Sequence, residues 1–295
     1  MTEGFQRAIG KPFGGAMGQS PIPESLRVSY LGAKSFMKTN YHTHTARCGH
    51  AVGTDEQYIE AAISQGYDEL GFSDHVPWPY ESGYTHTHVR MTMDRLDEYV
   101  AAMREHKKKY ADRINLLIGF ECEYFPAYMN WLRDMKQEKR LDYLILGNHY
   151  DGSDETGMYF GNAKTAAELR RYVEMTVKGI ESGVFAYLAH PDLFMRRYGR
   201  FDENCRAAAR DLCQACKENN LPMEYNLHDR YRLGELNRDG YPHPAFFDIA
   251  YDAGVDVIIG IDAHEPEELS DPTQRERAEK ELARFGDRWL RTINL

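Results

Sequence analysis

The chain has 295 residues and a formal net charge of -10, which argues against non-specific nucleic-acid binding because such binding requires a basic surface. A hydrophobic fraction of 42% is ample for a large core, yet no run of about 18 apolar residues predicts a membrane span and no secretory pattern marks the N-terminus. Five widely spread cysteines do not indicate a disulfide framework, so we expect a reducing, cytoplasmic compartment.

Residues 1–36 are rich in glycine and proline without a sustained period, which predicts a poorly ordered N-terminal extension. Met37 is then a candidate natural start, and residues 37–295 are expected to form one domain. Within this domain, short apolar runs alternate with longer amphipathic stretches. The strand-like runs lie at 36–41, 69–73, 114–120, 141–147, 184–189, 221–227 and 255–261.

The amphipathic stretches predict helices at 55–65, 94–110, 164–182, 202–219, 243–253 and 273–284. Candidate N-caps for four of them are Thr54, Asp94, Thr165 and Asp202. Seven strand-then-helix units indicate a parallel α/β fold, either a barrel or a doubly wound sheet. We favour the barrel because the C-terminal ends of its strands converge on one rim, and metal-binding residue types lie at those ends.

Histidines and carboxylates gather where the strand-like runs end. The set consists of His42, His44, His50, His75, Glu121, His149, His190, Asp262 and His264. Side chains at i and i+2 of a strand point the same way, so His42 and His44 can hold one ion together. Imidazole and carboxylate suit zinc, iron or manganese, and nine groups are too many for a single ion. The pattern predicts two to three divalent transition-metal ions (Zn, Mn or Fe) and metal-assisted hydrolysis.

At these positions the sequence resembles the polymerase and histidinol phosphatase (PHP) family of metal-dependent phosphoesterases. The matching motifs are Tyr41-His42-Thr43-His44-Thr45, Arg47-Cys48-Gly49-His50, Gly71-Phe72-Ser73-Asp74-His75, Gly119-Phe120-Glu121, Ala189-His190-Pro191-Asp192-Leu193 and Gly260-Ile261-Asp262-Ala263-His264. They occur in the family's order over residues 38–265. The resemblance implies a distorted (β/α)7 barrel of the PHP type that usually holds three metals.

The resemblance also divides the ligands among three metal sites. It implies a first site from His42, His44, Glu121 and Asp262. A second site would share Glu121 as a bridge with His149 and His190. The third would use His50, His75 and His264.

Within the family the chain is most similar to the bacterial histidinol-phosphate phosphatase branch. This similarity implies hydrolysis of L-histidinol phosphate to L-histidinol and phosphate in histidine biosynthesis, with a metal-bound hydroxide as the nucleophile. The chain departs from the usual branch pattern at Gly147-Asn148-His149, at Ile261 and in the segment after Asn226. Another small phosphomonoester or a nucleotide is therefore the alternative substrate, and a non-catalytic metal-binding module is the third hypothesis.

Substrate contacts are predicted from the loops that follow the ligand strands. Arginine matches phosphate with a planar fork, so the candidate phosphate-binding residues are Arg196, Arg197, Arg230 and Arg232, with a solvated surface position as the alternative for each. His228 is a candidate general acid for the leaving alkoxide, and Asp192 is a candidate for binding the amine of the substrate. We expect a small phosphorylated substrate and neither a nucleic-acid nor a membrane partner. The sequence does not specify an oligomeric state.

Overall fold

The computed structural model describes residues 37–233 and 240–295, so the predicted extension at 1–36 lies outside the described residues. Four parallel strands form one sheet in chain order: β1 (Thr39–Asn40), β2 (Glu69–Phe72), β3 (Asn115–Cys122) and β4 (Tyr143–Leu146). A second parallel pair consists of β5 (Met223–Asn226) and β6 (Val257–Gly260). These strands occupy six of the seven predicted positions.

The remaining predicted strand, at 184–189, joins the two sheets without forming a regular strand. Leu188 bridges Leu146 of β4 on one side and Met223 of β5 on the other. Its amide donates to the carbonyl of Pro222 and its carbonyl accepts from the amide of Glu224, but Pro222 has no N–H to donate to this segment, so the ladder does not continue past it. At the other edge Thr43 bridges Ala263, which closes the curled sheet. The predicted distorted (β/α)7 barrel is therefore confirmed.

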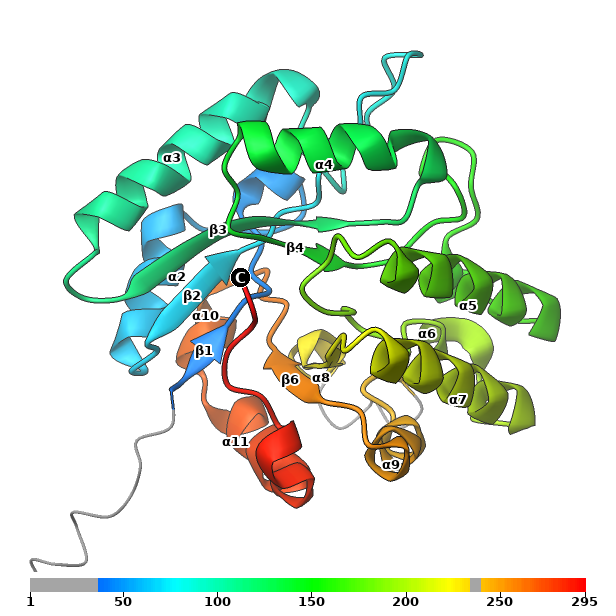
Figure 1. Cartoon of the computed structure of the whole chain (residues 1–295). Coiled ribbons are helices and arrows are strands. Elements are labelled where there is room, and N and C mark those ends of the chain that lie inside the picture. Colours follow the sequence, from blue (N-terminus) through cyan, green and yellow to red (C-terminus); the bar gives the residue numbers. More distant parts are fainter. Residues whose placement is uncertain (1–36, 234–239) are drawn as a thin grey trace, which may run out of the picture. The chain divides into compact units, whose positions relative to one another are not determined.

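Helices surround the strands (Figure 1). They are α2 (Asp55–Ser64), α3 (Leu96–Lys109), α4 (Met129–Glu138), α5 (Ala166–Glu181), α6 (Met195–Tyr198), α7 (Glu203–Glu218), α8 (His228–Leu233), α9 (Pro244–Ala253), α10 (Pro266–Ser270) and α11 (Thr273–Leu282). Short 3-10 turns are η2 (Ala46–Cys48), η3 (Met93–Arg95), η4 (Pro126–Tyr128), η5 (Phe160–Asn162) and η7 (Ala283–Arg288). All six predicted helices are present, and α4 and the short helices α6, α8 and α10 are additions to them. In the part of the chain that the structure describes, no helix combines the length and apolarity needed to cross a membrane.

Three of the four predicted N-caps are confirmed. Thr54 and Thr165 each form a capping box with the residue three positions later, and Asp202 accepts hydrogen bonds from two amides of α7. The prediction for Asp94 was wrong, because Asp94 lies inside η3 and the α-helix begins after that turn, at Leu96.

The inside of the barrel is filled by an apolar cluster that is separate from the larger core between strands and helices. Its buried members are Tyr41, Leu117, Tyr143, Ile145, Tyr187, Ala189, Ile258 and Ile293. Ile293 comes from the C-terminal segment, which passes between β1 and β6 (Figure 1). That segment is held by a parallel bridge from Trp289 to Val257 and by the Thr39 hydroxyl, which donates to the Arg291 carbonyl at 2.5 Å.

Candidate metal centre

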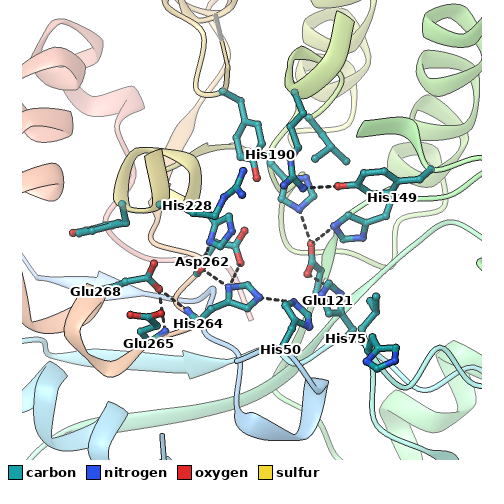
Figure 2. A pocket seen from close by; sticks show the side chains of 18 of the residues that line it. His50, His75, Glu121, His149, His190, His228, Asp262, His264, Glu265 and Glu268 are labelled. Carbon is teal, nitrogen blue, oxygen red and sulfur yellow. Dashed lines mark hydrogen bonds and ion pairs between the residues drawn. The ribbon is translucent and has the colours of Figure 1, made fainter. Parts of the chain in front are cut away.

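All nine predicted metal ligands lie at one end of the barrel. They follow β1, β2, β4, β6 and the 184–189 segment or, for Glu121, lie near the end of β3. Figure 2 shows seven of them pointing toward one another: His50, His75, Glu121, His149, His190, Asp262 and His264. These seven line a cavity of ≈ 810 Å³. His42 and His44 are fully buried behind them.

Glu121 is the central residue of this group because its two oxygens face different histidines. Oε2 lies 3.3 Å from His42 Nε2, 3.4 Å from His44 Nε2 and 3.1 Å from His75 Nδ1. Oε1 lies 2.7 Å from His190 Nε2 and 3.3 Å from His149 Nε2. A Cβ on Gly147, directly after the neighbouring strand β4, would overlap this carboxylate, so glycine leaves the space for it. The arrangement suits a carboxylate that bridges two ions.

Asp262 completes the first predicted site. Its Oδ1 lies 3.1 Å from His44 Nε2 and 3.4 Å from His42 Nε2. The same two nitrogen atoms also face Glu121 Oε2. At the third predicted site His50 Nε2 and His264 Nε2 are 2.9 Å apart. Ring nitrogens of His44, His75 and His264 lie within 4.8 Å of one another.

The donor atoms themselves indicate whether these residues fit metal ions. His42 Nε2, His44 Nε2, His75 Nδ1 and Asp262 Oδ1 are buried and have no hydrogen-bond partner. Burying polar atoms without a partner is unfavourable, so such atoms are uncommon in folded proteins. A divalent cation between them would satisfy each lone pair, and the residues therefore fit the predicted centre.

The electrostatics of the group keep the carboxylates ionised and divide the histidines into two sets. Burial works to raise the pKa of Glu121, but the neighbouring histidines, led by His149 and His42, outweigh it and hold that pKa well below its usual value. Burial lowers the pKa of His75 and His264 well below the usual value, and burial together with His44 lowers that of His50 to about 4. Burial also works to lower the pKa of His42, His44 and His190, but Asp262 and Glu121 outweigh it, so the pKa of His42 is well above its usual value, that of His44 is about 9 and that of His190 is raised. Metals bind ionised carboxylates and neutral imidazoles, so a cation at these three histidines would take the place of their protons.

Two carboxylates that the sequence analysis did not identify as part of the centre hold the outer nitrogens of two ligands. His42 Nδ1 lies 2.8 Å from Glu224 Oε1, and His149 Nδ1 lies 3.2 Å from Glu123 Oε1. Both glutamates are fully buried, and Glu123 also accepts from Arg90 Nη2 at 2.9 Å. For Glu224 the available signal was a charged residue inside a strand-like apolar run, whereas Glu123 lies directly after β3.

The four predicted phosphate-binding arginines divide into two pairs. Arg196 and Arg232 line the cavity of the metal ligands, whereas Arg197 and Arg230 do not. Arg196 Nη1 donates to the Tyr159 hydroxyl at 2.7 Å. Arg197 is exposed and lines a neighbouring cavity. Arg230 turns away because its guanidinium pairs with Glu281 at 2.8 Å and donates to the Tyr225 hydroxyl.

The two remaining predicted substrate contacts also differ in position. His228 lines the cavity, with its ring 4.7 Å from that of His264. Asp192 does not line it; the residue is fully buried, and its Oδ2 accepts from the His243 amide at 2.6 Å. Burial raises the pKa of Asp192 to about 7. The structure therefore does not direct this carboxylate toward a substrate. The cavity has other acidic lining residues, namely Glu265, Glu267, Glu268 and Asp271.

The chain is a parallel α/β barrel with nine imidazole and carboxylate groups at its strand ends. Groups of this kind can hold metal ions, which places the chain among α/β barrels with a candidate metal centre. The family model described as "PHP domain" matches residues 40–228, and the chain belongs to the PHP domain family. The resemblance noted in the sequence is thereby confirmed.

Similar proteins cover most of the chain. A "Probable histidinol-phosphatase" of Deinococcus radiodurans is 28% identical over 240 residues, which are 77% of this chain and 86% of that protein. A protein of the same name from Schizosaccharomyces pombe is 26% identical over 262 residues, 79% of this chain and 82% of the relative. The fold is also that of histidinol phosphate phosphatase from Lactococcus lactis, solved with zinc, L-histidinol and phosphate. That structure has a TM-score of 0.68 and 17% identity, covering 88% of this chain and 100% of the other.

Proposed function

We propose that this protein is a metal-dependent phosphomonoesterase that hydrolyses L-histidinol phosphate to L-histidinol and phosphate in histidine biosynthesis. The observation that carries the proposal is the set of donors around Glu121 in a cavity that Arg196 and Arg232 also line. The names of the bacterial and yeast relatives support the choice of substrate. The ligands bound to the Lactococcus lactis enzyme agree with it.

The proposed cofactors are two to three zinc, manganese or iron ions, held in the three groups implied by the family resemblance. When bound, they would supply Lewis acidity and lower the pKa of water toward neutrality. The protein contributes positioning and charge. Tyr159 holds the Arg196 guanidinium by a hydrogen bond, and a guanidinium in the cavity is suited to orient the phosphate.

His228 is the residue that we assign to proton transfer. Its Nδ1 lies 3.2 Å from the Asp262 carbonyl, to which an Nδ1–H donates. The ring nitrogen that remains to carry an exchangeable proton is then Nε2. Burial lowers the pKa of His228, so the neutral ring would first take up a proton at Nε2. From the wall of the cavity the resulting imidazolium can then pass that proton to the leaving alkoxide as the ester bond breaks.

The charges that line the cavity favour a substrate that carries both signs. Arg196 belongs to α6, while Glu265, Glu267 and Glu268 come from the start of α10. Histidinol phosphate combines an anionic phosphate with a cationic amine. We therefore assign the amine to the acidic wall at α10, in place of Asp192.

Steady-state kinetics on the zinc-loaded protein test this function. We expect kcat/KM for histidinol phosphate to exceed that for p-nitrophenyl phosphate, despite the poorer leaving group, because contacts with the amine and imidazole stabilise the transition state. Glu267→Gln should lower kcat/KM for histidinol phosphate and leave the nitrophenyl ester unaffected. Glu276→Gln, an exposed position on α11 that does not line the cavity, is the matched control.

Three other outcomes would point elsewhere. A tenfold preference for the nitrophenyl ester would replace this proposal with a broader phosphoesterase. Preference for a nucleoside monophosphate would identify the alternative substrate class. A metal-loaded protein that turns over none of these esters would be a non-catalytic module.

We also propose a reducing, cytoplasmic location, since all five cysteines are buried free thiols. A small phosphorylated molecule is the proposed partner. The net charge of -10 agrees with a protein that does not bind nucleic acid non-specifically.

A further inference from the structure

β5 differs from the other strands because none of the nine predicted metal ligands lies on it or directly after it. It nevertheless carries two fully buried polar side chains, Glu224 and Asn226. Residues two apart in a strand share a face, so both point the same way. Buried polar groups are stable only when they are hydrogen-bonded, and the partners of this pair reveal its role.

Glu224 holds two metal ligands, one with each oxygen. Oε1 lies 2.8 Å from His42 Nδ1, and Oε2 accepts from the His190 backbone amide at 2.9 Å. A neutral imidazole has one N–H and one lone pair. When Nδ1–H donates to Glu224, the lone pair of His42 is on Nε2. That atom faces Glu121 at 3.3 Å and Asp262 at 3.4 Å.

Asn226 extends the same contact to a third ligand. Its Nδ2 donates to Glu224 Oε2 at 2.7 Å and to Asp262 Oδ2 at 3.2 Å. The other oxygen of Asp262, Oδ1, is thereby left facing His42 and His44. Asn226 Oδ1 accepts from the amide of His228 at 2.9 Å, so the pair also fixes the start of α8.

Two of these ligands have unfavourable backbone conformations. His190 has a φ of 27° and Asp262 a φ of 56°, in the left-handed region that residues other than glycine seldom adopt. Such a conformation persists only where surrounding contacts enforce it. The backbone of His190 and the side chain of Asp262 are both held by the Glu224–Asn226 pair.

The neighbouring strand leaves room for the pair. Asn226 is paired with Gly260 of β6, and a Cβ on Gly260 would overlap the Glu224 carboxylate. Gly260 therefore leaves space for the Glu224 carboxylate, as Gly147 leaves space for the Glu121 carboxylate. Two glycines at the ends of two strands thus accommodate two buried carboxylates.

We propose that Glu224 and Asn226 are positioning residues: they set His42 to bind metal through Nε2 and keep His190 and Asp262 aimed at the centre. This inference rests on the proposed metal centre. Partners of this kind outside the ligand set commonly change metal affinity about 10–100-fold when they are removed.

Glu224→Gln tests the proposal while preserving the shape of the side chain. If the amide oxygen of glutamine faces His42, its NH2 opposes the amides of His190 and Asn226. If the amide is reversed, its NH2 donates to His42 Nδ1 and places the ring proton on Nε2, which blocks metal binding. Competition titration with a zinc chelator should show affinity falling about 10–100-fold.

The matched control is Glu69→Gln, which alters a buried carboxylate on β2 that contacts Tyr41 and Asn115 and no predicted metal ligand. It should bind zinc as the wild type does. In the zinc-loaded wild type labelled with 15N-histidine, NMR should find the His42 proton on Nδ1. A proton on Nε2, or unchanged zinc affinity in Glu224→Gln, would overturn the proposal.

Asn226→Ser is the second variant if Glu224→Gln does not fold. It removes the amide bridge to Asp262 and leaves the contact between Glu224 and His42. We expect weaker zinc binding with the His42 proton still on Nδ1, and wild-type affinity would refute the role of the pair. A wild type without metal would instead refute the proposed function, so the two failures are distinguishable.

Discussion

At the scale of single residues, the centre depends on groups that contact several partners at once. Glu121 has two histidine nitrogens facing Oε1 and three facing Oε2. Arg196 lines the same cavity from a fixed position, because Tyr159 holds its guanidinium. Removing either group should therefore affect a specific property of the site.

Glu121→Gln should lose more than one metal ion per chain. A neutral amide cannot place a negative oxygen toward two sets of imidazoles, so both neighbouring sites weaken. Elemental analysis of protein purified without chelator measures the loss against a wild type that we expect to hold two to three ions. A wild type with one ion or none would rule out the cluster.

Arg196→Ala should weaken inhibition by inorganic phosphate about tenfold or more with metal content unchanged, since a charge-assisted contact contributes roughly 1.5–3 kcal/mol. Arg197→Ala, at the adjacent exposed position outside the cavity, is the control and should behave as the wild type does. Equal inhibition constants for both variants would mean that phosphate is held without Arg196.

At the scale of secondary-structure elements, short sequence patterns predicted those features that depend on residues only a few positions apart. Thr54 and Thr165 cap their helices through residues three positions away, so the pattern is visible in a short stretch. The strand at 184–189 was predicted from its apolar run, but its irregularity comes from Pro222 on a neighbouring segment. α4 was missed although it buries Met129, Leu132 and Met135 on one face.

The metal ligands were recognisable for a related reason: their motifs are short, and each lies at a strand end. Their supporting residues were not recognisable, because the contact of Glu224 with His42 joins positions 182 residues apart. The same limit explains Asp192. Its distance along the chain from His190 gave no information about the direction of its side chain, which turns to the amide of His243.

Thr165→Ala tests the local part of this account. The substitution removes the hydroxyl that accepts from the Glu168 amide, keeps the bond from the backbone amide of residue 165 to the Glu168 carboxylate, and should lower the free energy of unfolding by about 1 kcal/mol. Metal content should not change, because α5 carries none of the predicted ligands. Denaturant titration measures the stability, and a loss of metal in this variant would show that α5 and the centre are coupled.

At the scale of the whole molecule, the predicted ligands come from six of the seven segments of the barrel, with β5 as the exception. Ions bound among them would connect strands that are far apart in sequence. Without a cation, the ionised Glu121 and Asp262 remain buried beside imidazoles. The stability of the fold and the occupancy of the centre should therefore be linked.

Removal of metal by a chelator should lower Tm. Binding at a concentration 100 times Kd stabilises the folded state by about 2.7 kcal/mol, so we expect a decrease of at least about 5 °C. Thermal denaturation before and after chelation, with zinc added back, provides the measurement. An unchanged Tm in protein shown to be free of metal would separate the centre from the stability of the fold.

The placement of Ile293 has a consequence for the order in which the protein can be made. This side chain lies in the interior cluster together with Tyr41. Close to both, a hydrogen bond joins Thr39 to Arg291, which are 252 residues apart in the sequence. A growing polypeptide can form its early helices and pair β1 with β2 while synthesis continues. It cannot fill the inside of the barrel until residue 293 has emerged from the ribosome. Until then, apolar surface around Tyr41 and Tyr143 stays uncovered, and the nascent chain at this stage is the form most exposed to aggregation and chaperone binding.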